Sequence, residues 1–173
     1  AVGVLVSLLA PAHGATPEQI GRGKYFFGAT GGGGCHTEKA KPVNAGGRRY
    51  DGPFGTVYAT NITPDVKTGI GNWTDAQIIE AIRSGRRPNG ERLIPVHPYT
   101  TFNGMAEPDL KVLTAYLRTL PAVNRANQPK KITAPLFESV FLPTWLAAFS
   151  PRETPPPAAP TSADHPSGTQ IVQ

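Results

Sequence analysis

The 173-residue sequence contains only one cysteine, Cys35, and only one methionine, Met105. A single cysteine excludes an intramolecular disulfide and a zinc site built from several thiolates. No apolar run is long enough, as the sequence stands, to cross a bilayer as a helix. The 39% hydrophobic content suffices for one modest core, so we expect one folded domain with loose ends.

Glycine and proline are abundant, with 19 residues of each. Because both interrupt helices and strands, they predict many turns and few long strands. The formal net charge of +5 favours acidic partners. The basic residues form no long run and are not interleaved with aromatic residues, so nucleic acid is not expected to bind. Most of this charge is expected to be solvated surface, and the rest a docking face for an acidic protein.

The chain is expected to divide into four parts. Residues 1–15 form an apolar stretch followed by small residues, which is typical of the end of an export signal; an uncleaved membrane anchor is the alternative. Residues 16–122 are expected to form the folded domain, residues 123–150 a strap or short helix, and residues 151–173 a proline-rich linker. The expected location is the periplasm, with attachment to the membrane through the N-terminus as the alternative.

Three segments of the folded domain carry helix signals. Residues 16–29, 74–85 and 107–121 each combine a helix-start pattern with apolar residues on one side. Residues 31–73 show neither a helix period nor a strand period and contain repeated turn signals. A long loop with apolar and aromatic residues inside a compact domain is expected to wrap a ligand.

The adjacent pair Cys35 and His36 directly follows the first of these predicted helices. Such a pair can bond a haem vinyl group through sulfur and the haem iron through imidazole. The usual motif is C-x-x-C-H, but Gly32 stands at its first position, so at most one thioether is expected. Met105 suits a second axial ligand because its thioether is soft and uncharged. His97 is the alternative at that position, since imidazole also binds iron well.

Four stretches of the chain resemble class I cytochromes c, in particular the haem domains of cytochrome c subunits of membrane-bound bacterial dehydrogenases. They read GRGKYFF, GCHT, AGGRRYDGPFGTVYATNITPDVKTGIGNWTDAQIIEAIRSGRRPNGERLIPVHPY and FNGMAEPDLKVLTAYLRTLP. The resemblance implies an all-α bundle that wraps one haem c, with long irregular loops and a C-terminal extension. It also implies that His36 is the proximal ligand, Met105 the distal ligand and Cys35 the covalent anchor.

The same resemblance implies further contacts to the cofactor. Trp73, Tyr58 and Arg48 are expected to neutralise or hydrogen-bond the haem propionates. Asn61 and Tyr99, within the matched stretches, are further candidates for contacts to the haem.

The resemblance also places the first helix across the last one. Gly23 and Phe27 would pack against Leu113 and Tyr116, where a glycine lets two helices cross closely. One departure concerns the iron site, because His97 stands where relatives often have a methionine before Pro-Tyr.

The expected function is one-electron transfer between redox proteins, without substrate chemistry, because both axial positions would be filled. The expected partners belong to a membrane-bound complex of a respiratory or photosynthetic chain. Two alternatives stay open. One is a haem peroxidase or gas sensor with an open sixth position, and the other is a haem-free exported binding module.

Overall fold

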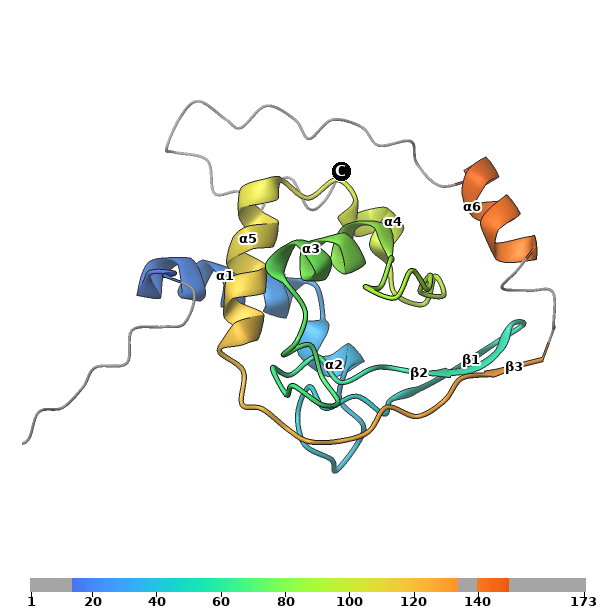
Figure 1. Cartoon of the computed structure of the whole chain (residues 1–173), viewed down its shortest axis with the longest axis horizontal. Coiled ribbons are helices and arrows are strands. Elements are labelled where there is room, and N and C mark those ends of the chain that lie inside the picture. Colours follow the sequence, from blue (N-terminus) through green and yellow to red (C-terminus); the bar gives the residue numbers. More distant parts are fainter. Residues whose placement is uncertain (1–13, 134–139, 150–173) are drawn as a thin grey trace, which may run out of the picture.

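The structure is a computed structural model that describes residues 14–133 and 140–149 (Figure 1). The whole predicted linker and most of the predicted export segment lie outside these residues. The helices are α1 (Pro17–Ala29), α2 (Gly32–Cys35), α3 (Asp75–Ser84), α4 (Tyr99–Phe102), α5 (Glu107–Arg118) and α6 (Leu142–Phe149). The strands are β1 (Arg49–Gly52), β2 (Gly55–Tyr58) and β3 (Lys131–Ile132).

The ends of α1 and α3 follow from local capping signals. At the start of α3 the Thr74 hydroxyl accepts a hydrogen bond from the Gln77 amide at 3.2 Å, and the Gln77 side chain accepts one from the Thr74 amide at 2.9 Å. Thr16 and Gln19 form the same reciprocal pair at the start of α1. Gly85 ends α3 with a φ of 67°, which favours glycine. These two predicted helices and α5 are all present.

Helices α1 and α5 cross in direct contact, as Figure 1 shows. A Cβ atom on Gly23 would lie 2.8 Å from the Tyr116 Cβ, so only glycine allows this approach. The Phe27 and Tyr116 rings pack with centroids 5.3 Å apart. The predicted crossing is therefore confirmed, although Val112 rather than Leu113 supplies the other close contact to Gly23.

A hydrophobic core lies between α3, α5 and the loop that precedes α3. It contains Ile70, Ile78, Leu117 and Leu120, all buried, with Trp73 packed against them. This core fixes α3 against α5.

A small antiparallel sheet lies at the lower right of Figure 1, with strand order β1-β2-β3. The Thr56 hydroxyl of β2 donates to the Asp51 carboxylate of β1 at 2.6 Å and so ties the two strands together, while Arg49 of β1 donates to the same carboxylate at 2.9 Å. Strand β3 pairs Ile132 with Gly55. The protein is mostly helical but not purely so, and the expected all-α fold is confirmed only in part. The strands escaped prediction because two to four residues are too short to show an alternating pattern.

The segment after α5 returns beneath the helices to reach β3, along the lower edge of Figure 1. Residues 123–130 are the first part of the segment expected to form a strap or short helix, and from here on only these residues are called the strap. Arg125 forms an ion pair with Glu38 and donates to the Gly46 carbonyl at 2.8 Å.

Helix α6 contacts the rest of the protein through its first residue, because Leu142 is buried beside Tyr99. Within the described residues, none of the helices combines the length and apolar character needed to traverse a bilayer.

Candidate functional site

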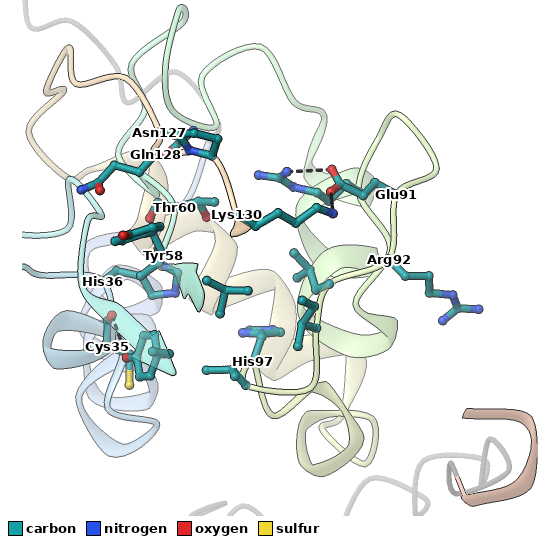
Figure 2. Close-up of a pocket in the computed structure, with 18 of the residues that line it drawn as sticks. Cys35, His36, Tyr58, Thr60, Glu91, Arg92, His97, Asn127, Gln128 and Lys130 are labelled. Carbon is teal, nitrogen blue, oxygen red and sulfur yellow. Dashed lines mark hydrogen bonds and ion pairs between the residues drawn. The ribbon is translucent and has the colours of Figure 1, made fainter. Parts of the chain in front are cut away.

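A cavity of about 490 Å³ lies between the sheet, the strap and the loop that links α3 to α4 (Figure 2). Its lining consists of residues 35–36, 57–60, 91–94, 96–98 and 127–130, together with Tyr50 and Arg87. Apolar side chains such as Val57, Leu93 and Ile94 form much of its wall. The loop expected to wrap a ligand therefore does enclose a cavity, together with segments far away in the sequence.

His36 is the residue at the end of α2 and faces this cavity (Figure 2). Its Nδ1 lies 2.8 Å from the backbone oxygen of Thr60. Because a carbonyl oxygen only accepts, Nδ1 donates, and the neutral ring then carries its lone pair on Nε2. Burial lowers the pKa of His36, and the bond to Thr60 partly opposes that shift. His36 is thus a neutral, oriented imidazole of the kind that binds metals.

Gly46 allows Thr60 to approach His36. Its φ of 75° lies in the left-handed region, and a Cβ at this position would lie 2.6 Å from the Thr60 carbonyl carbon. The Gly46 amide also donates to the His36 backbone oxygen at 2.8 Å. One glycine therefore holds the histidine backbone and the carbonyl that orients its ring.

Cys35 lines the same cavity, and its side chain is exposed. The turn that carries it is braced from outside: the Tyr50 hydroxyl donates to the Cys35 carbonyl at 3.1 Å, and Arg48 donates to the Gly34 carbonyl at 2.8 Å. The Arg48 guanidinium also lies 5.6 Å from the centre of the Tyr50 ring. At Gly32, a side chain would clash with the Phe27 ring, so the packing matches a motif with one cysteine.

Charged groups line one side of the cavity. Glu91 pairs with Arg87 at 3.0 Å and with Lys130 at 2.5 Å, and Arg92 also lines the cavity. Hydrogen bonding by Lys130 lowers the pKa of Glu91 to about 2, with Arg87 adding to the effect. Arg87 and Lys130 outnumber the single anion Glu91, which suits a ligand with carboxylates. Sequence reasoning missed these residues, because Lys130 comes from the strap and no local pattern links it to Glu91.

His97 also lines the cavity and was considered only as an alternative ligand. Its Nε2 is buried and has no hydrogen-bond partner within residues 14–133 and 140–149. The pKa of His97 is lowered to about 4, mainly by burial and in part by its electrostatic interaction with His36, while a backbone hydrogen bond with Ile82 opposes the shift. His97 is therefore a neutral imidazole with an unused ring nitrogen.

The three predicted propionate partners lie in different parts of the structure. Tyr58 lines the cavity. Trp73 packs against the core between α3 and α5, outside the cavity lining. Arg48 braces the turn before Cys35 and is not part of the lining either. The contacts of all three residues with a cofactor stay predictions. Of the three, only Tyr58 lines the cavity.

Asn61, Tyr99 and Met105 do not line the cavity. The Asn61 amide donates to the Val123 carbonyl at 2.7 Å and to the Thr68 hydroxyl at 3.0 Å, which fixes the strap. The Tyr99 ring is buried against Leu142. Met105 is half-buried, and its amide donates to the Phe102 carbonyl at 3.0 Å. Met105 as a distal ligand stays a prediction from the sequence.

Several known proteins with similar sequences are named as subunits of bacterial dehydrogenases. The chain is 37% identical over 138 residues to a nicotinate dehydrogenase component of Pseudomonas putida, covering 80% of this chain and 12% of that protein. It is 33% identical over 158 residues to the cytochrome c subunit of the quinone-dependent alcohol dehydrogenase of Gluconobacter oxydans, covering 90% of this chain and 33% of the relative. The chain is homologous to the cytochrome c subunits of bacterial dehydrogenases.

A third relative extends this comparison. A diheme cytochrome c-type protein of Cereibacter sphaeroides is 35% identical over 132 residues, which cover 73% of this chain and 45% of that protein. The chain thus spans less than half the length of each of these three relatives. No family model matches the chain.

The residues at the cavity fit a c-type haem. The Nε2 lone pair of His36 and the adjacent thiol of Cys35 supply an iron ligand and an attachment point. The cavity volume of about 490 Å³ lies within the range of cofactor sites. Apolar wall residues suit the porphyrin faces, and the cations near Glu91 suit its two propionates.

Proposed function

We propose that this chain is a one-electron carrier that holds one haem c in the cavity, tied by a single thioether to Cys35 and ligated by His36. The observation that carries the proposal is the hydrogen bond from His36 Nδ1 to Thr60, which leaves Nε2 available beside the only cysteine of the chain. The homology to cytochrome c subunits supports it.

The chemistry divides between the cofactor and the chain. Bound haem supplies an iron that cycles between two oxidation states. The chain orients the imidazole of His36 through Thr60, and this hydrogen bond raises the basicity of the ligand. Apolar wall residues exclude water, which affects the potential of the iron. Because Cys35 is exposed, the porphyrin edge that it would anchor would lie near the surface, where a partner could dock.

The physiological setting is part of the same proposal. Relatives named as dehydrogenase cytochrome subunits point to a larger oxidoreductase as the electron donor. A periplasmic location follows from the predicted export segment, and the net charge of +5 suits an acidic docking surface on the partner. Residues 16–122 would form the haem domain, with the strap closing one side of the cavity.

A pyridine haemochrome spectrum of the purified chain, combined with acid–acetone extraction, tests this function. We expect a c-type spectrum with one thioether and haem that stays with the wild-type protein. In Cys35→Ser the haem should become extractable. A colourless, folded wild-type protein would contradict the proposal. Fast stoichiometric binding of carbon monoxide by the reduced wild-type protein would instead favour a peroxidase or gas sensor with an open sixth position.

A further inference from the structure

We propose that His97, and not Met105, is the second axial ligand of the haem, so that two imidazoles hold the iron. This inference rests on the proposed function, because it concerns the sixth position of the same haem.

The two histidines reach the cavity from different parts of the chain. His36 comes from the end of α2, and His97 comes from the loop between α3 and α4 on the facing side in Figure 2. Both line one cavity, together with the apolar residues that would cover the porphyrin faces. A haem bound in that cavity would meet one imidazole from each of the two facing walls, and each could hold its iron.

The free ring nitrogen of His97 is the decisive feature. Its Nε2 is buried and has no hydrogen-bond partner within the part of the chain that the structure describes. A buried polar atom without a partner destabilises a fold, so such an atom calls for an explanation. Coordination to iron would use this lone pair, and His97 lines the same cavity as His36.

The backbone and its neighbours hold His97 in place. Its amide donates to the Ile94 carbonyl at 3.1 Å, and its own carbonyl accepts from the Tyr99 amide at 2.8 Å. The Phe102 ring lies edge-on to the imidazole, with centroids 5.6 Å apart. Tyr99 is itself buried, which anchors this loop to the core. The imidazole is thus oriented before any ligand arrives, as a ligating side chain should be.

Met105 lacks these features. It does not line the cavity, and it lies in the turn between α4 and α5, where its amide donates to the Phe102 carbonyl. The structure therefore has His97, and not Met105, in the wall of the cavity. A pair of imidazoles also predicts a lower reduction potential than a histidine–methionine pair, because methionine ligation raises the potential.

The test compares the purified holoprotein with His97→Met and with the matched control Met105→Leu. The wild-type ferric protein should show the electron paramagnetic resonance signal of a low-spin bis-imidazole haem and no red-region band of a methionine–iron bond. Met105→Leu should leave the spectrum and the potential unchanged. His97→Met should produce the red-region band and raise the potential. His97→Ala should open the reduced iron to carbon monoxide, whereas Met105→Ala should not.

A red-region band in the wild type that disappears in Met105→Leu would overturn the assignment while leaving the proposed function intact. A pyridine haemochrome spectrum without haem would instead overturn the proposed function and the ligation together. Should His97→Met fail to fold, as judged by circular dichroism, the wild-type spectrum and the Met105→Leu comparison decide the question alone.

Discussion

Asn61 binds the strap at two points, through its side chain to Val123 and through its backbone to the side chain of Asn127. The Asn61 amide nitrogen of the backbone donates to the Asn127 side-chain oxygen at 2.7 Å, and its side chain donates to the Val123 carbonyl at 2.7 Å. The strap thereby closes the cavity next to Thr60, the residue that orients His36. Strap and iron site are thus coupled through consecutive residues of one loop.

Replacing Asn61 by Ala should destabilise the protein. The change removes the side-chain oxygen that accepts from the buried Thr63 amide at 3.0 Å, and a buried donor left without a partner costs about 1–3 kcal/mol. Chemical denaturation followed by circular dichroism measures the loss. Asn72→Ala is the control, because Asn72 makes one exposed bond to the Val66 carbonyl and should change stability little. Equal effects of the two variants would contradict the role given to Asn61.

Gly46→Ala should disturb both stability and the iron site. The alanine would adopt a left-handed φ and press against the Thr60 carbonyl carbon, at a cost of about 1–3 kcal/mol. Because Thr60 orients His36, the potential of the haem should shift as well. The matched control is Gly28→Ala in α1, where a Cβ meets no atom within 4 Å and should stabilise the helix by roughly 0.5–1 kcal/mol. An unaltered potential in Gly46→Ala would contradict the link to His36.

Glu91→Gln should make the stability less dependent on pH in the acid range. The folded-state pKa of Glu91 is lowered from 4.5 to about 2, so its ion pairs stabilise the fold above pH 4.5 and lose their effect as the pH falls towards 2. The variant should therefore melt at a lower temperature than the wild type at pH 7, with the difference shrinking below pH 4.5. Melting curves across this range measure it. A difference that stays constant down to pH 2 would contradict the pairing with Lys130 and Arg87.

Gly32→Cys should restore a second thioether. The new side chain creates the C-x-x-C-H motif, and the Phe27 ring that occupies its space has to move. The pyridine haemochrome band should shift to the position of a haem with two thioethers. Gly33→Cys is the control: a Cβ there lies 3.6 Å from the nearest Phe27 atom, so it fits, but its spacing to Cys35 is wrong. A shifted band in Gly33→Cys would show that the band does not report on motif spacing.

Local signals made much of the fold predictable from the sequence. The capping pairs Thr16–Gln19 and Thr74–Gln77 fix the starts of α1 and α3 within a few residues of chain. The pairing of Cys35 with His36 is equally local, because both lie at the end of one short helix. Such features need no knowledge of the rest of the chain.

Features that depend on distant partners were not predictable. Strand β3 pairs Ile132 with Gly55, and no local pattern specifies that register. Lys130 meets Glu91 for the same reason. Trp73 was expected to contact the haem propionates. The structure shows it packed against the core between α3 and α5, a contact that no local pattern specifies. Side-chain roles of this kind follow from tertiary structure alone.

Mass spectrometry of the proteolytic peptide between Lys24 and Lys39 tests the central claim most directly, because this peptide contains both Cys35 and His36. The account predicts that the peptide from the native protein carries the mass of one haem, attached at Cys35 through one thioether. The same peptide with a free, alkylatable thiol and no haem, isolated from protein made in a host that matures c-type cytochromes, would contradict it.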